Sequence, residues 1–326
     1  MGECLIARGQ TATKNVLDDI PVSGDYCSIV VLLQDSAGGP CENTKINCKD
    51  GTRWYNYTTN EAGMVLFKCN SGAANISANN WINGIYTFDQ AAVNKDYDAP
   101  VGTKRLEKLN FGKINRFYQI SGSYTGQFRS IDSISNLIVV GGGGGATGGY
   151  NQAGWGGPYG CGGGGGAKNY AAIVDIVRNQ VYTISVGAGG SGIQGSGANP
   201  ANSGGTSSAF GLSANGGSGA SNGILGAGAK GLFNGGNGAV GSWAGNNHGK
   251  DGVNGAGGGG GGGTMNQNGI GHGGNNGGGN GASQVSGTSG IAGSGGGGGG
   301  GGQPYGYNKN ATYGGSGGSG RIEFDM

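Results

Sequence analysis

Glycine recurs at every third residue in separate runs of this 326-residue chain, the longest being 154–166, 249–261 and 287–302. Of the 85 glycines, 72 lie in residues 141–320, where they make up 40% of the sequence. Because glycine loses more conformational freedom on folding than any other residue, ordering this stretch costs on the order of 100 kcal/mol, with few side chains to bury in return. The stretch is therefore either a flexible linker or a structure held together by its own backbone.

The three-residue period favours the ordered alternative. A left-handed extended helix has three residues per turn, so a glycine at every third position lines one face that carries only hydrogen atoms. Two such faces can approach closely, and their N–H and C=O groups can pair between neighbouring helices. We therefore expect a bundle of polyglycine II helices. Collagen is excluded, because its period is unbroken and it needs far more proline than Pro158, Pro200 and Pro304 provide.

Uninterrupted glycine runs predict the centre of this bundle. A helix surrounded by neighbours has no face left for side chains, whereas an outer helix needs only one glycine face. The uninterrupted runs, predicted to be central, are Gly141–Gly145, Gly162–Gly166, Gly257–Gly263 and Gly295–Gly302. The mixed run 223–241 is predicted to be outer.

The first part of the chain has the pattern of an all-β sandwich. Short β-rich segments are separated by turn sequences at regular spacing, namely 26–35, 43–48, 52–58, 63–69, 73–77 and 81–88. Residues 94–113 are polar and are interpreted as a connector. The order of strands and turns over 28–77 resembles transthyretin-like and carboxypeptidase-regulatory-like modules, which implies an attachment or spacer role. We predict two domains, 1–114 and 115–326.

Between the glycine runs lie two kinds of segment. The apolar, β-like segments predict a small sheet layer that anchors the bundle, and they are 117–128, 136–140, 170–177, 180–186 and 320–324. Other segments are rich in aromatic residues and asparagine, a composition typical of binding loops. The candidate receptor-binding residues are Tyr150, Trp155, Tyr159, Trp243, Asn246, His248, Tyr305, Tyr307, Asn308 and Tyr313. The alternative is that these aromatic residues merely cap the bundle.

Several chemistries find no support in the sequence. The net charge is +2 without a basic cluster, so nucleic acid is not an expected partner. No apolar run is long enough to span or insert into a membrane, and no signal peptide is evident at the N-terminus. Two histidines and two acidic residues in 141–320 provide no catalytic or metal-binding arrangement, so we expect no enzyme activity, metal or cofactor. Without a secretion signal, Cys27, Cys41, Cys48 and Cys69 are expected to be reduced thiols.

Four motifs occur in order across 117–326. They are Asn-Leu-Ile-Val-Val followed by five glycines (136–145), Val-Tyr-Thr-Ile-Ser-Val-Gly-Ala-Gly-Gly (181–190), Gly-Gly-Thr-Ser-Ser-Ala-Phe-Gly (204–211) and the closing Gly-Gly-Ser-Gly-Arg-Ile-Glu-Phe (317–324). Together they resemble the glycine-rich domain of bacteriophage tail-fibre proteins. The long runs are similar in type to the polyglycine-helix adhesin at the tip of T-even-type long tail fibres.

This resemblance implies a tail-fibre or tail-tip receptor-binding protein of the virion, made in the host cytoplasm. Its expected partners are a bacterial surface protein or glycan and other tail-fibre or virion proteins, and association of the chain with itself is left open. The alternatives are a bacterial surface adhesin with the same domain, a decoration or spacer protein without a receptor, and an ice-binding slab.

Overall fold

A computed structural model describes residues 17–149, 159–195, 200–221, 223–242, 247–264, 270–302 and 311–326. The described chain is mainly β, with several sheets; its single helical element is a short 3-10 turn, η1 (Val253–Gly255). The described residues within 1–115, 125–132 and 176–181 form one compact unit, and those within 116–124, 133–175 and 182–326 form a second.

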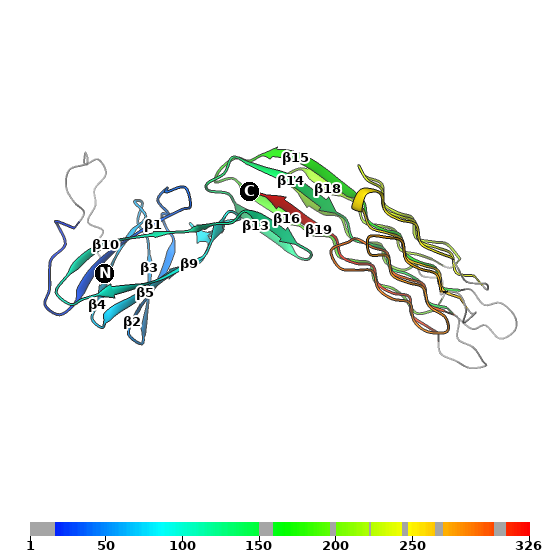
Figure 1. Ribbon diagram of the computed structural model, residues 1–326, viewed down its shortest axis with the longest axis horizontal. Coiled ribbons are helices and arrows are strands. Elements are labelled where there is room, and N and C mark those ends of the chain that lie inside the picture. The colour runs from blue at the N-terminus through cyan, green and yellow to red at the C-terminus, as the bar shows by residue number, and fades with distance from the viewer. Residues whose placement is uncertain are drawn as a thin grey trace. The chain divides into compact units, whose positions relative to one another are not determined.

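Two sheets of the first unit share one hydrophobic core, as in a β-sandwich. The three-stranded sheet has the order β10-β1-β4, and the four-stranded sheet has the order β3-β2-β5-β9 (Figure 1). Alternate residues of both sheets point into the core, among them Ile29, Phe67 and Ile76, each 0% exposed. The strands are β1 (Cys27–Gln34), β2 (Lys45–Asp50), β3 (Arg53–Thr58), β4 (Met64–Cys69), β5 (Gly72–Ala78), β9 (Val93–Ala99) and β10 (Lys104–Asn110). Two short pairs complete the unit, β6 (Trp81–Ile82) with β7 (Ile85–Tyr86) and β8 (Gln90–Ala91) with β11 (Gly112–Lys113).

The prediction that 94–113 is a connector was wrong. These residues contain β9 and β10, and β10 pairs in parallel with β1. Both are edge strands, whose outward side chains are mostly polar, and this polarity concealed the buried residues Tyr97, Ala99 and Leu109. The predicted strand 81–88 is likewise interrupted by a turn at Asn83 and Gly84, both with positive φ.

Two more four-stranded sheets occupy the region predicted to anchor the glycine runs. Their orders are β12-β19-β14-β15 and β13-β16-β17-β18. Phe324 stacks on Phe117 with ring centroids 4.8 Å apart and meets Phe210 edge-on at 5.3 Å. The strands are β12 (Arg116–Gln119), β13 (Ser123–Gln127), β14 (Ser133–Val140), β15 (Lys168–Asp175), β16 (Val181–Ser185), β17 (Ser207–Ala209), β18 (Leu212–Ala214) and β19 (Arg321–Asp325). The strands predicted at 136–140, 170–177, 180–186 and 320–324 are confirmed, and 117–128 forms two strands rather than one.

The rest of the second unit consists of extended segments that lie side by side (Figure 1). We call this set the glycine block: 141–149, 159–167, 186–195, 200–206, 215–221, 223–242, 247–264, 270–302 and 311–320. Strands lead directly into several of these segments, as β14 leads into 141–149. Backbone hydrogen bonds connect the segments to one another along their lengths.

Successive residues of the central segment 141–149 form backbone hydrogen bonds with different neighbouring segments. The N–H groups of Gly141, Gly142 and Gly143 donate to Ala167, Gly205 and Gly318, and the next N–H, of Gly144, returns to the first neighbour at Gly164. The carbonyls of Gly142, Gly143 and Gly144 accept from three other segments, at Gly217, Gly190 and Gly298. A β-strand pairs with at most two neighbours in one plane, whereas this segment pairs with six around its axis.

Burial follows the glycine pattern. The uninterrupted runs Gly141–Gly145, Gly162–Gly166, Gly257–Gly263 and Gly295–Gly302 are buried throughout, and 223–241 is exposed at intervals, so the predicted division into central and outer runs is confirmed. In 215–220 and 313–318 the pattern exposed, intermediate, buried repeats every three residues. The exposed positions, such as Ser218 and Ser316, carry the side chains.

Close approach explains the glycines of the central runs. A Cβ added to Gly143 would lie 2.0 Å from the carbonyl oxygen of Gly296, and one added to Gly144 would lie 2.0 Å from that of Ser218. Neither glycine has a positive φ. These positions therefore require glycine for its missing side chain and not for an unusual backbone conformation.

Replacing Gly143 with alanine should destabilise the second unit by about 3 kcal/mol, since a buried backbone cannot yield without breaking neighbouring hydrogen bonds. The matched control is Ser218→Ala, at an exposed position of an outer segment, which should change stability little. Calorimetric unfolding of both variants measures the difference. Equal stability of Gly143→Ala and the parent chain would contradict this account of the packing.

Candidate functional site

Three of the predicted receptor-binding residues lie in the described chain, namely Tyr159, His248 and Tyr313. The others, Tyr150, Trp155, Trp243, Asn246, Tyr305, Tyr307 and Asn308, lie outside the described residues.

The three described residues lie at or near one end of the glycine block. Gly160 donates to the carbonyl of Gly301, and Gly263 donates to that of Gly160. The N–H of Gly262 donates to the carbonyl of Asn247, the residue before His248. Tyr313 forms an isolated β-bridge with Gln194, beside the same group of segments. We call the described residues 147–149, 159–160, 247–248, 262–264, 300–302 and 311–313 the outer end. The described residues that flank Tyr150–Trp155, Trp243–Asn246 and Tyr305–Asn308 belong to this end or lie next to it.

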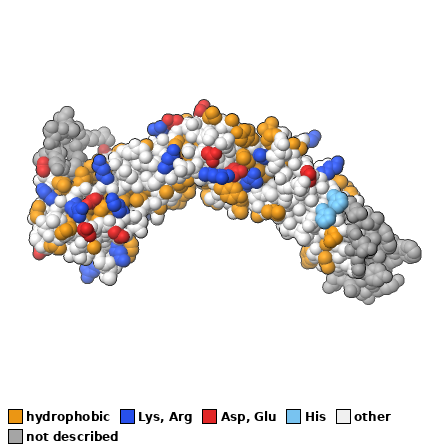
Figure 2. All heavy atoms as spheres, viewed as in Figure 1, with side chains coloured by type: hydrophobic (Ala, Val, Ile, Leu, Met, Phe, Trp, Pro, Cys, Tyr) orange, Lys and Arg blue, Asp and Glu red, His pale blue; other side chains and the backbone are white. Residues whose placement is uncertain are grey.

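His248 forms a stacked pair with His272. The ring centroids are 5.2 Å apart and the ring planes differ by 5°, and both side chains are exposed (Figure 2). The backbone N–H of His272 donates to Nδ1 of His248 over 3.0 Å, so a neutral His248 carries its proton on Nε2. No local signal pointed to His272, because the two residues meet only when 247–252 and 270–275 lie side by side.

The described residues that follow Tyr305–Asn308 begin at 311, and they are anchored by Thr312. Its hydroxyl accepts from the N–H of Gly149 at 2.8 Å and donates to the carbonyl of Gly302 at 2.7 Å. The next side chain, Tyr313, is 54% exposed, and its N–H donates to Ser286 Oγ. A buried polar anchor thus presents an exposed aromatic ring.

Tyr159 fits the capping interpretation better. It is partly buried, burial raises the pKa of its hydroxyl, and a Cβ added to Gly241 would lie 2.4 Å from its own Cβ. Its side chain therefore packs over a glycine of the neighbouring segment.

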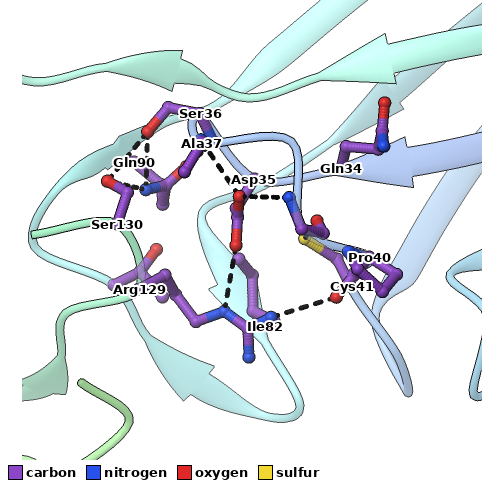
Figure 3. A network of polar contacts seen from close by, with 12 residues as sticks. Gln34, Asp35, Ser36, Ala37, Pro40, Cys41, Ile82, Gln90, Arg129 and Ser130 are labelled. Atoms are coloured by element: carbon purple, nitrogen blue, oxygen red, sulfur yellow. Dashed lines mark hydrogen bonds and ion pairs between the residues drawn. The ribbon is translucent and has the colours of Figure 1, made fainter.

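A second concentration of polar side chains lies in the first unit (Figure 3). Arg129 donates through Nη2 to the carbonyl of Pro40 at 3.0 Å, and its Nε lies 3.7 Å from the carboxylate of Asp35. That carboxylate also accepts from the N–H groups of Ala37 and Gly39. The loop that follows β1 is thereby fixed to residues 129–130.

Asp89 and Gln90 complete the network, and both are 0% exposed. Asp89 accepts from the N–H groups of Arg129 and Ser130 and from the Ser130 hydroxyl, at 2.7–3.1 Å. The Gln90 side chain accepts from Ser36 N–H and donates to the hydroxyls of Ser36 and Ser130. These bonds hold segment 125–132 in the first unit, and the buried Nε of Arg129 has the ion-pair contact with Asp35 but no hydrogen-bond partner among the described residues.

The described cysteines are unpaired and buried: Cys27, Cys41, Cys48, Cys69 and Cys161. Cys27 and Cys69 are opposite one another in the β1–β4 register. Burial raises the pKa values of Cys41 and Cys48 to about 12. The expectation of reduced thiols at Cys27, Cys41, Cys48 and Cys69 stays a prediction.

Within the described ranges, no group of three or more His, Cys, Asp or Glu side chains is placed to hold a metal ion. The same residues include no helix of the length and apolarity needed to cross a bilayer.

Comparison with known proteins identifies no family. No family model matches this sequence, and no curated protein matches it. A similar solved structure is that of a DUF3823 family protein from Parabacteroides merdae, at 9% identity and a TM-score of 0.21, covering 50% of this chain and 91% of that protein. A TM-score this low does not indicate a shared fold.

Replacing the fully buried Asp89 with alanine should lower the stability of the first unit by roughly 3 kcal/mol, because three partly buried donors lose their acceptor. The control is Asp132→Ala, which removes an exposed ion pair with Arg178 and should have little effect. Chemical denaturation of both variants tests this. A similar loss in the two variants would contradict a central role for the Asp89 network.

The thiols should resist alkylation in the native protein. With the pKa values of Cys41 and Cys48 raised to about 12, only a minute fraction is thiolate at pH 8, and burial blocks access as well. Iodoacetamide labelling followed by peptide mass spectrometry should show both residues modified only after denaturation, with native labelling still slight at pH 9. Rapid native labelling of either residue would refute this.

Proposed function

We propose that the segments of the glycine block are polyglycine II helices. Three observations support this. Burial repeats every three residues in the outer segments, successive N–H groups donate to different neighbouring segments in turn, and successive carbonyls accept from different segments in turn. The backbone of Gly252 (φ −77°, ψ 146°) and Ala256 (φ −68°, ψ 158°) is close to the values of such a helix. A bundle of this kind is rigid, because each central helix is tied to neighbours on all sides.

We further propose that the protein is a receptor-binding protein of a bacteriophage tail fibre or tail tip, located in the virion. The observation that carries the proposal is that exposed aromatic and imidazole rings lie at or near one end of the glycine block. The pair His248–His272 and the anchored Tyr313 belong to this set. The ordered motifs in 117–326, which resemble phage glycine-rich domains, support the same function.

In this proposal the outer end binds a protein or glycan of the bacterial surface, through aromatic stacking and amide hydrogen bonds. The first unit attaches the protein to other tail-fibre or virion proteins. The bacterial surface adhesin, the spacer protein and the ice-binding slab remain alternatives. An adhesin would share the receptor site, a spacer would bind no cell, and an ice-binding protein would show thermal hysteresis.

The test is binding of labelled, purified protein to a panel of bacterial cells. Replacing Trp155, Trp243, Tyr305 and Tyr307 with serine should reduce binding to the recognised strain at least about tenfold, because aromatic side chains supply much of the binding energy in recognition. Leu232→Ser is the control, since Leu232 is 62% exposed but lies beside β15. Thr312 is kept in every variant so that its anchor remains.

Undiminished binding by the four-residue variant would remove these loops from the receptor site. Binding to no strain of a broad panel, with the fold intact by circular dichroism, would favour the spacer alternative.

A further inference from the structure

The outward face of sheet β3-β2-β5-β9 in the first unit is polar over all four strands. Its opposite face is core, with Ile46, Cys48, Ile76 and Ala99 each 0% exposed. Side chains alternate between the two faces of a strand, so the outward set follows from the register. It comprises Lys45, Asn47, Lys49, Trp54, Asn56, Thr58, Ala73, Asn75, Ser77, Asn94, Asp96 and Asp98, which we call the polar sheet face.

One row of this face crosses the sheet without a gap. Lys49 is opposite both Trp54 and Asn75, and Asn75 is opposite Asp96. A shallow depression of about 470 Å³ lies over the part of this row formed by Lys49, Asn75 and Asp96, with Ser71 and Asp98 also in its lining, and Trp54 lies outside that lining. The polar sheet face is therefore hollowed where its functional groups are densest.

The side chains of the row are held in place by one another. The amide nitrogen of Asn75 donates to Asn94 Oδ1 and to Asp96 Oδ1, both at 2.7 Å, which leaves its own oxygen as an acceptor. The Lys49 ammonium lies 5.5 Å from the centre of the Trp54 ring, and that ring is 57% exposed. The row thus offers a flat aromatic surface, an ammonium donor, an amide acceptor and a carboxylate.

These groups select the chemistry of the ligand. Lys45 and Lys49 balance Asp96 and Asp98, so neither a polyanion nor a polycation is complementary to the face. Trp54 and Ala73 are its apolar members, whereas the centre of a protein interface is richer in apolar surface. A sugar fits: its hydroxyls both donate and accept, its C–H face stacks on an aromatic ring, and it is neutral.

We propose that the polar sheet face binds a neutral oligosaccharide along the row from Trp54 to Asp96. Adjacent strands lie ~4.8 Å apart, close to the length of one pyranose unit, so successive sugar units can meet successive strands. The first sugar residue of the oligosaccharide stacks on Trp54, and the following sugar residues form hydrogen bonds with Lys49, Asn75 and Asp96. This site is separate from the outer end of the glycine block and does not depend on the receptor-binding function proposed above.

Calorimetric titration of the full chain with cellotetraose, maltotetraose and chitotetraose tests the proposal. At least one of these should bind, and Trp54→Ala and Asn75→Ala should each weaken that binding about tenfold. Trp81→Ala is the matched control, because Trp81 is 54% exposed but belongs to the separate β6–β7 pair and not to sheet β3-β2-β5-β9. Since Trp54 is exposed and Asn75 lies on the outward face, circular dichroism should show both variants folded.

The proposal is overturned if none of the three tetrasaccharides binds at millimolar concentration, or if binding persists unchanged in Trp54→Ala and Asn75→Ala. Binding of heparin in their place would also overturn it, because the ligand would then be a polyanion. The variant with serine at Trp155, Trp243, Tyr305 and Tyr307 should keep full oligosaccharide affinity. Failure of either proposal is thus distinguishable from failure of the other.

Discussion

Hydrogen bonding between bare backbones is the interaction on which the second unit depends. An isolated extended segment pairs none of its own N–H and C=O groups, so each segment is stable only when neighbours supply the partners. Those partners must come close, as Gly143 shows, where even a methyl group would collide with a neighbouring carbonyl. The glycine content is therefore a consequence of the pairing geometry, and each hydrogen bond offsets part of the large entropy cost of ordering glycine.

The same geometry restricts where chemistry can occur. Central segments have no free face, and outer segments expose one position in three, so side chains gather on the outside and at the ends. Residues distant in sequence then become neighbours through the alignment of segments. His248 and His272 meet in this way, and so do Asp251 and Asn275, whose side chains bond at 3.0 Å. The exposed groups on the glycine block are thus brought together by the alignment of neighbouring segments and not by any local sequence motif.

This dependence explains what could be predicted from the sequence. Alternation and turn residues located the strand at 26–35 and most of those that follow, because these signals are local. Glycine runs indicated which segments are buried, because in this fold only a segment without side chains can be surrounded by neighbouring backbones on all sides. The edge strands β9 and β10 were missed, since half their residues face water. Asp89 and His272 were missed because their partners lie 40 and 24 residues away in the sequence.

The two units therefore rest on different physical bases, and this difference determines where each can bind a ligand. The first unit buries side chains such as Phe67 and Ile76 on one face of each sheet, so the other face is free to carry Trp54 and Asn75 in a fixed register. In the glycine block a central segment has no second face, because all sides are used for backbone pairing. Binding groups must then sit on outer positions or in the segments that connect the runs. A sheet face suits a ligand with repeated units, whereas a cluster of loops suits a compact surface feature.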